Sequence, residues 1–371
     1  MTDRPKLLLL LPHLGGGGAE RVMARLAQGL SQEKYDIHLA LVTETGIPVD
    51  AVGPGVTVHT CGAKRVRKAG PRLLRLVRRL HPDLIVSGMF HLNFLVLLLR
   101  PLFPAGTLVL VRQNGTVSAS LADDCLPLYT RLLYRVLYRR ADRVICQSAA
   151  MASDLARTLR LDPDRIAVLL NPVDVDGIRS AAQASPCLWS SPGPHLLAVG
   201  RLAVEKGFDL LLDALACVRE QFPHCDLVIA GAGHQEAALR AQCHRLGLES
   251  AVHFAGQVEL PAAYFPGATL FVLSSRHEGM PNALLEAAAA GLPLVATPAS
   301  PGLIDLLDRQ PGAWLAEEIS AGALGKTLNG TLNALRPGER FAHHFIQDFR
   351  TGSVVGAYEA LLDAMLRRNR R

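Results

Sequence analysis

The sequence predicts an α/β protein made of two doubly wound parallel-sheet domains that face one another across a cleft. The first observation is that apolar runs of strand length alternate with helical segments along the whole chain. The second is that these runs are continuously apolar, as in strands buried on both faces of a parallel sheet. The third is the length of 371 residues, which exceeds what one core usually supports and predicts two domains.

Ten apolar runs are predicted as strands, five in each half of the chain. In the first half they are Lys6–Leu11, Ile37–Val42, Leu84–Ser87, Thr107–Val111 and Arg143–Gln147. In the second half they are His195–Val199, Leu227–Ala230, Val252–Phe254, Leu270–Leu273 and Leu294–Ala296. Helical periodicity fills the intervals, as at Ala19–Leu30 and Pro71–Leu80.

The best domain boundary is the stretch 176–194, which is rich in Ala, Ser, Pro and Gly and lacks sustained periodicity. We therefore expect a Rossmann-like domain over residues 1–175, a linker over 176–194 and a second Rossmann-like domain over 195–350. Residues 351–371 are expected to form a C-terminal helix that packs back toward the first domain. Ligands should bind at the loops that follow the strands.

Composition excludes several classes of protein. The seven cysteines form neither a disulfide framework nor a metal knuckle, which favours a reducing, cytoplasmic compartment. No run approaches the roughly 18 apolar residues of a membrane-spanning helix. Acidic pairs such as Asp123-Asp124 have too few ligands to specify a metal site, so we expect no metal.

The net charge of +6 is concentrated in one block. Ala51–Pro82 lacks Asp and Glu but holds Lys64, Arg65, Arg67, Lys68, Arg72, Arg75, Arg78 and Arg79. In a second segment, Leu126–Arg140, arginines recur every four residues among apolar side chains. Such helices indicate peripheral contact with an anionic membrane, although a solvated basic face remains the alternative. Nucleic acid is not an expected partner, because no aromatic residue lies within Ala51–Pro82 to stack on bases.

The first strand is followed by a turn of four glycines, Gly15 to Gly18, just before a predicted helix. Such a turn brings backbone N–H groups close to a ligand at the positive helix end. It does not fit G-x-G-x-x-G, because Glu20 and Arg21 cannot serve as the third glycine, and a dinucleotide cofactor is therefore disfavoured. The alternative is a tight turn with no ligand.

Two segments of the second half carry more specific chemistry. In Gly200–Gly207, Arg201 and Lys206 flank a strand-to-helix turn and can converge on one diphosphate, although a surface pair of cations is the alternative. Two cations would stabilise a nucleoside diphosphate leaving group without Mg²⁺. In the second segment, Pro281 suits the first turn of a helix, Glu278 is placed to orient a sugar, and Glu286 can accept hydrogen bonds from vicinal hydroxyls.

Together these motifs resemble the retaining glycosyltransferases of the GT-B fold, especially the family 4 group, whose E-x7-E motif matches Glu278 to Glu286. The motifs occur in that family's order: Ala19-Glu20-Arg21, Asn171-Pro172-Val173-Asp174, Gly200-Arg201 with Lys206-Gly207, Gly231-Ala232-Gly233 and Glu278 to Glu286. The resemblance implies that Arg201 and Lys206 hold the donor diphosphate and act in catalysis with Glu278.

The same resemblance assigns the remaining site residues. Glu286 would bind the ribose, and the backbone of Gly279, Met280, Pro281 and Asn282 the transferred sugar. Gly231, Gly233 and Val258 would lie near the base. In the first, acceptor-binding domain, the residues lining the cleft would be Gly16, Gly17, Gly18, Gln113, Asn114 and Asn171. Gln113 stands where many relatives carry a histidine, and it can hydrogen-bond the donor sugar but cannot titrate.

The expected function is that of a retaining, metal-independent glycosyltransferase. By resemblance it would transfer a hexosyl or N-acetylhexosaminyl group from a nucleotide diphosphate sugar, with UDP-sugar as the first choice, to a glycan or lipid-linked acceptor in surface polysaccharide or lipopolysaccharide synthesis. It would need no cofactor, since the nucleotide sugar is a co-substrate. A GT-B-like sugar-nucleotide epimerase and a basic nucleic-acid-binding protein remain the alternatives.

Overall fold

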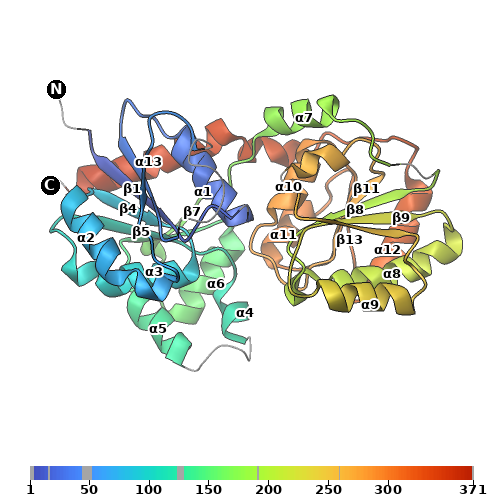
Figure 1. Ribbon diagram of the computed structural model, residues 1–371, viewed down its shortest axis with the longest axis horizontal. Helices are drawn as coiled ribbons and strands as arrows, with labels where there is room; N and C mark the ends of the chain where they lie inside the picture. Colours follow the sequence, from blue (N-terminus) through green and yellow to red (C-terminus); the bar gives the residue numbers. More distant parts are fainter. Residues whose placement is uncertain are drawn as a thin grey trace. The chain divides into compact units, whose positions relative to one another are not determined.

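The structure is a computed structural model that describes residues 4–15, 17–43, 52–122, 129–189, 192–258 and 260–369. Gly16 and residues 126–128 of the second basic segment lie outside these ranges. The chain divides into two compact units: residues 1–172 with 348–371, and residues 173–347 (Figure 1). Each unit contains one parallel sheet covered by helices, which confirms the predicted pair of α/β domains.

The sheet of the first unit has seven strands in the order β3-β2-β1-β4-β5-β6-β7. The strands are β1 (Lys6–Leu11), β2 (Asp36–Leu41), β3 (Thr57–Thr60), β4 (Leu84–Ser87), β5 (Leu108–Arg112), β6 (Arg143–Cys146) and β7 (Ile166–Val168). The strand order reverses between β1 and β4, which pair in parallel. Loops at such a switch point form the ligand-binding edge of doubly wound sheets.

Two helical layers cover the two faces of this sheet. Alternate strand residues such as Leu8 and Leu10 belong to one core, and Leu7 and Leu9 to the other, because side chains of a strand point to opposite faces. The first core is completed by α2 (Gly70–Leu80), α3 (Phe90–Leu99), α5 (Tyr129–Tyr138) and α6 (Ala149–Leu159). The second is completed by α1 (Gly18–Gly29) and α13 (Thr351–Asn369). A short helix, α4 (Val117–Ala122), follows β5.

The sheet of the second unit has six strands in the order β10-β9-β8-β11-β12-β13. The strands are β8 (His195–Val199), β9 (Asp226–Ala230), β10 (Val252–Gly256), β11 (Leu270–Leu273), β12 (Leu294–Ala296) and β13 (Ala313–Leu315). The helices are α7 (Val175–Ala184), α8 (Phe208–Gln221), α9 (Glu236–Arg245), α10 (Asn282–Ala289), α11 (Pro301–Leu307) and α12 (Ala321–Ala334). Leucines of α8 and α12 share one core with β8 and β11.

All ten predicted strands are present, with ends that differ by at most two residues. The stretch 176–194 differs from the expected linker, because α7 fills its first part and belongs to the second unit. Asp174 starts this helix by accepting a hydrogen bond from the N–H of Gly177 at 3.0 Å. Within the described part of the chain, no helix has both the length and the apolar character needed to cross a bilayer.

Candidate active site in the second unit

The two strongest sequence motifs meet because the strands before them are neighbours. β8 and β11 pair in parallel, so the loops at their carboxyl ends lie at one edge of the sheet. The loop after β8 runs from Gly200 to Gly207 and includes the short helix η5 (Val204–Lys206). The loop after β11 runs from Ser274 to Pro281. Residues about 70 positions apart in sequence are therefore brought together.

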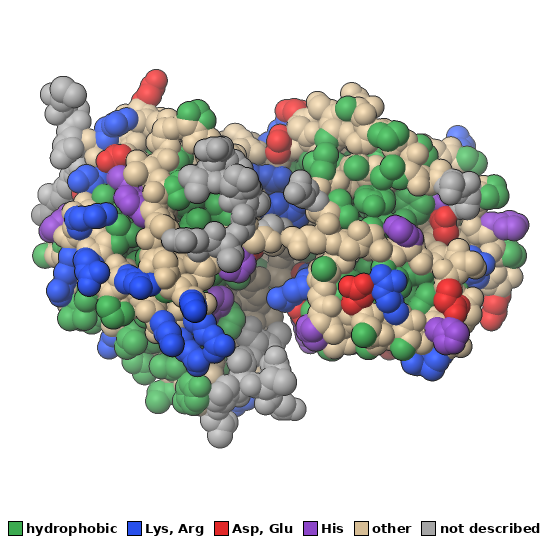
Figure 2. Space-filling model, in the orientation of Figure 1, with side chains coloured by type: hydrophobic (Ala, Val, Ile, Leu, Met, Phe, Trp, Pro, Cys, Tyr) green, Lys and Arg blue, Asp and Glu red, His purple; other side chains and the backbone are tan. Residues whose placement is uncertain are grey.

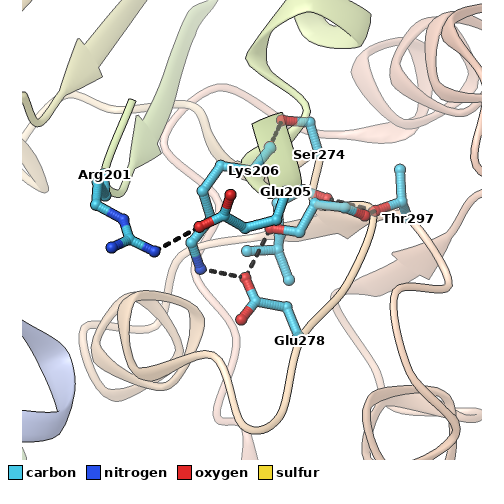
Figure 3. Close-up of polar contacts among 8 residues, drawn as sticks. Arg201, Glu205, Lys206, Ser274, Glu278 and Thr297 are labelled. Carbon is cyan, nitrogen blue, oxygen red and sulfur yellow. Dashed lines mark hydrogen bonds and ion pairs between the residues drawn. The ribbon is translucent and has the colours of Figure 1, made fainter. Parts of the chain in front are cut away.

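At the centre of this edge is an ion pair between Lys206 and Glu278 (Figure 3). Lys206 Nζ lies 2.6 Å from Glu278 Oε1, which also accepts a hydrogen bond of 2.6 Å from Ser275 Oγ. The Glu278 side chain is only 8% exposed and that of Lys206 is 24% exposed. Among the described residues Lys206 Nζ has no second partner, so donors of its ammonium group remain available.

The turn that presents Lys206 depends on Gly207. Its φ is +61°, and a Cβ at this position would lie 2.1 Å from the carbonyl oxygen of Ser274. Ser274 Oγ in turn donates a 2.9 Å hydrogen bond to the carbonyl oxygen of Lys206. The loop after β8 and the end of β11 thus approach to a distance that only glycine permits.

Arg201 does not share the carboxylate of Lys206. Arg201 Nη2 is 2.5 Å from Glu205 Oε1, and its side chain is 70% exposed, so the two cations contact different carboxylates (Figure 3). Partial burial acts to raise the pKa of Glu205, but the hydrogen bonds from its own backbone and from Arg201 outweigh it and lower the pKa. The convergence of Arg201 and Lys206 on one diphosphate stays a prediction.

A second ion pair, which sequence reasoning missed, joins the loop after β11 to the first turn of α8. The guanidinium of Arg276 donates to both carboxylate oxygens of Asp209 at 2.7 and 2.6 Å and to the carbonyl oxygen of Val204 at 3.0 Å. The hydrogen bonds from Arg276 are the main reason that the pKa of Asp209 is lowered. Asp209 lies in the first turn of α8, and no spacing rule links it to Arg276.

The loop after β11 leads directly into α10, which carries Glu286. Pro281 takes the position before the first helical residue, one place earlier than expected, and its carbonyl oxygen accepts hydrogen bonds from the N–H groups of Leu284 and Leu285. Gly279 and Met280 are buried, Asn282 is half-buried and begins the helix, and Glu286 is 5% exposed. The N–H of Glu278 donates to the carbonyl oxygen of Ala299, which anchors the loop.

The glycines after β9 bring a third loop to the same edge. A Cβ on Gly231 would lie 1.8 Å from the carbonyl oxygen of Gly200, and one on Gly233 would lie 2.2 Å from that of Leu202. The N–H of Gly231 donates to the carbonyl oxygen of Gly256 at 2.7 Å. Gly231 and Gly233 therefore permit close backbone packing beside the Gly200–Gly207 loop, and half-buried Val258 follows Gly256.

The residues predicted in the first unit divide into buried and accessible groups. Gln113 is 3% exposed: its Oε1 accepts a 2.7 Å hydrogen bond from Tyr138 Oη, and its Nε2 donates to the carbonyl oxygen of Gly115 at 2.9 Å. Asn171 is also buried and accepts a hydrogen bond from Arg112 at 2.8 Å. Each end of the Gln113 amide thus has one protein partner and keeps a second N–H donor and a second acceptor lone pair, so its hydrogen bond to a donor sugar stays a prediction.

Three predicted residues of the first unit remain near the surface at the carboxyl end of the sheet. Gly17 precedes the first residue of α1, Gly18, with an extended backbone. Asn114 is exposed and donates to the carbonyl oxygen of Gly88. His91, the second residue of α3, has a pKa that is lowered mainly by burial and then by His13. These residues surround the switch point between β1 and β4.

The comparisons with known proteins agree with this fold. Residues 193–333 match the family model for glycosyl transferases group 1, and residues 16–176 match the model for glycosyltransferase family 4. An uncharacterised glycosyltransferase of Haemophilus influenzae is 32% identical over 341 residues, which are 88% of this chain and 90% of that protein. The chain therefore belongs to the group 1, or family 4, glycosyltransferases. It is a transferase enzyme.

Two further likenesses are to characterised proteins. The N-acetylgalactosamine-N,N'-diacetylbacillosaminyl-diphospho-undecaprenol 4-alpha-N-acetylgalactosaminyltransferase of Campylobacter jejuni is 26% identical over 84% of this chain and 86% of its own length. The crystal structure of Anabaena Alr3699/HepE in complex with UDP and glucose superposes with a TM-score of 0.79 at 20% identity, and covers 97% of this chain and 100% of that one. The latter likeness concerns the fold.

Proposed function

We propose that this glycosyltransferase moves a hexosyl or N-acetylhexosaminyl group from a UDP-sugar to a glycan or lipid-linked acceptor, with retention of configuration and without a metal ion. The reaction would serve bacterial-type surface polysaccharide or lipopolysaccharide synthesis in the cytoplasm. The observation that carries the proposal is the Lys206–Glu278 pair at the carboxyl edge of the second sheet, 2.6 Å between Nζ and Oε1.

In this proposal Lys206 stabilises the leaving diphosphate. Its ammonium group is held in place by Glu278 and keeps further N–H donors for phosphate oxygens. Arg201 is exposed and lies before the short helix η5, which ends at Lys206. When the diphosphate binds, the Arg201 guanidinium would move from Glu205 to the phosphate oxygens and supply a second positive charge. Positioned cations act most strongly on charge that develops in the transition state, and here the developing charge is on the diphosphate oxygen.

Glu278 would hold the transferred sugar rather than attack it. Both contacts of its carboxylate in the described part of the chain involve Oε1, so Oε2 can accept a hydrogen bond from a sugar hydroxyl. The acceptor oxygen would form its bond to the anomeric carbon on the face from which the diphosphate departs. The acceptor's proton passes to the departing phosphate oxygen, so no protein base is consumed.

The choice of donor and acceptor rests on relatives. The Anabaena structure contains UDP and glucose, and the Campylobacter jejuni enzyme is named for a diphospho-undecaprenol substrate. The lipopolysaccharide core biosynthesis glycosyltransferase LpsE of Rhizobium meliloti is 26% identical over 94% of this chain. These names support a UDP-sugar donor and a surface glycan or lipid-linked acceptor.

The test is to measure free UDP release from a panel of nucleotide sugars, with and without acceptor glycans and with EDTA present. Lys206→Ala should raise the transition-state free energy by about 2–4 kcal/mol, a fall of about 30- to 1000-fold in kcat/KM. Glu286→Gln should raise the donor KM, whereas Glu278→Gln should mainly lower kcat. UDP release that requires acceptor separates transfer from epimerisation.

Lys326→Ala is the matched control, because Lys326 is 73% exposed and pairs with the exposed Glu317 in the same unit. This variant should keep the wild-type kcat/KM. Wild-type turnover in folded Lys206→Ala would refute the assignment of the diphosphate site. Complete loss of activity in EDTA, restored by Mg²⁺ or Mn²⁺, would refute metal independence.

A further inference from the structure

One face of the first unit combines strong positive charge with exposed apolar side chains. From Ala51 to Ala141 the chain has fourteen Lys and Arg residues but only three Asp and no Glu, whereas the whole chain carries a net charge of only +6. The rest of the chain is therefore net acidic. In Figure 2, Lys and Arg side chains gather over α2 beside hydrophobic side chains toward α5. Such an uneven distribution of charge is typical of a surface that binds an anionic partner.

The helices α2, α3 and α5 form this face. All three contribute to the same core under the sheet, and α3 packs beside both α2 and α5. Arg78 Nε donates to the carbonyl oxygen of Leu102 at 3.2 Å, and Arg140 Nη1 donates to that of Leu97 at 3.4 Å. An arginine of α2 and one in the turn after α5 thus contact the C-terminal end of α3 and the residues just after it.

Large apolar side chains on α3, just after α3 and on α5 are exposed to solvent. Their exposed fractions are 57% for Leu98, 49% for Leu102, 63% for Leu132 and 47% for Val136. We call these four residues the apolar ridge. The inner side of α5 is separately filled by Tyr134, Leu137 and Tyr138, so the ridge is not needed to hold the helix on the core.

Four arginines on α2, on α5 or just after α5 are exposed: Arg75, Arg79, Arg135 and Arg139, which we call the arginine border. Within the described ranges, none of these guanidinium groups forms an ion pair with a carboxylate. Exposed Arg131, on the same side of α5, donates to the carbonyl oxygen of Leu121. The arginine border therefore presents its charge to solvent and not to the protein's own acidic groups.

We propose that this face docks on an anionic lipid surface, with the apolar ridge in the headgroup region and the arginine border against lipid phosphates. Leucine and valine beside arginine are what an interfacial site requires, since apolar insertion and phosphate pairing act together. A nucleic acid would use the charge but gain little from the ridge, which lacks aromatic rings for stacking. This proposal rests on the proposed function and extends it, because the membrane that carries a lipid-linked acceptor would contact the first unit.

The test is flotation of the full chain with vesicles of phosphatidylcholine alone or with about one third phosphatidylglycerol. We expect recovery with the anionic vesicles at low ionic strength, loss at high ionic strength, and little recovery with neutral vesicles. Replacing the arginine border by glutamine should lower the partition coefficient at least tenfold, since each basic residue contributes about fivefold. Leu98→Ser with Leu132→Ser should lower it about threefold or more, even at low ionic strength.

Two matched controls lie in the second unit. Glutamine at the exposed Arg240, Arg245, Arg309 and Arg336 changes the net charge equally, and Leu188→Ser with Leu260→Ser removes similarly exposed leucines. Both controls should float like the wild type. The proposal would be overturned if a control variant lost as much vesicle binding as the set that it matches. It would also be overturned if neutral and anionic vesicles recovered the protein equally.

Binding of short duplex DNA tests whether the face binds nucleic acid in place of lipid. If it binds with the same dependence on the arginine border while the leucine variants leave vesicle recovery unchanged, the face binds polyanions and not lipid. The vesicles contain neither sugar donor nor acceptor, so flotation is independent of catalysis. Loss of transfer to a soluble acceptor with vesicle binding kept would contradict the proposed function alone. Loss of vesicle binding with transfer kept would contradict the docking proposal alone.

Discussion

Gly207 links two requirements of the candidate active site, a left-handed backbone and a close approach to Ser274. Gly207→Ala should destabilise the chain by at least about 2 kcal/mol, because a left-handed alanine is unfavourable and its Cβ would lie 2.1 Å from a carbonyl oxygen. It should also displace Lys206 and lower kcat. Urea unfolding and steady-state kinetics measure the two effects.

Gly330→Ala provides the comparison for this prediction. Gly330 lies in α12, and a Cβ there would meet no atom within 4 Å outside its own helix. Alanine should stabilise that helix by about 0.5–1 kcal/mol. If Gly207→Ala were as stable and as active as wild type, the turn would not constrain Lys206.

At this scale the sequence predicts which loops come together better than which side chains touch. Lys206 and Glu278 were each placed near the donor, yet their direct pairing depends on β8 and β11 being neighbours. Gln113 is predicted to lie in the cleft, but its contact with Tyr138, on a helix 25 positions away, is not predicted: the buried Tyr138 hydroxyl donates to the side-chain carbonyl oxygen of Gln113. Local spacing contains no information about such distant partners.

Among the elements, burial decides which strands are visible in the sequence. The strands of both sheets that are covered on two faces read as unbroken apolar runs, and these were predicted. The three missed strands, β3, β7 and β13, are all edge strands of three or four residues with no buried position. A strand of three or four residues is too short for its pattern to be recognised, even where every residue is apolar, as in β7 and β13.

The segment after α12 contains a buried histidine that makes stability depend on pH. His343 is 3% exposed and its Nε2 lies 2.7 Å from the carbonyl oxygen of Leu292, just before β12. Burial lowers the pKa of His343 from its ordinary value of 6.5, although the hydrogen bond to Leu292 opposes this. As the pH falls below 6.5, the unfolded chain binds a proton that the folded chain does not, so stability is lost.

This loss should be as steep as about 1.4 kcal/mol per pH unit at most, and His343→Gln should remove it. Urea unfolding of wild type and variant between neutral pH and pH 5 measures the difference in slope. His344→Gln, at the adjacent exposed position, should keep the wild-type slope. Identical slopes in wild type and His343→Gln would exclude His343 as the titrating group.

For the molecule as a whole, the two units depend differently on the C-terminal helix. Six buried side chains of α13 belong to the core of the first unit: Val354, Val355, Tyr358, Leu362, Met365 and Leu366. The buried residues of the leucine-rich core of the second unit all come from the part of the chain between Leu196 and Leu332. Deleting residues 348–371 should therefore unfold the first unit and leave the second folded.

The two tryptophans make this prediction measurable, because Trp189 and Trp314 both lie in the second unit. In the deletion variant, the tryptophan emission transition should keep its midpoint while far-UV circular dichroism loses the first unit's share. A fragment of residues 173–347 should show the same emission transition. A deletion that shifts the tryptophan transition as far as the dichroism would show that the units fold as one.

Because α13 belongs to the first unit, the two units are completed at different times during translation. The first unit precedes the second in the chain, but the sheet face that α1 and α13 share is only partly covered until Thr351–Asn369 has been synthesised. The second unit, which is continuous from 173 to 347, emerges complete before that helix does. During translation the later domain can therefore finish folding first, and the earlier one exposes the apolar strand residues under α13 to chaperones for most of the time it takes to make the protein.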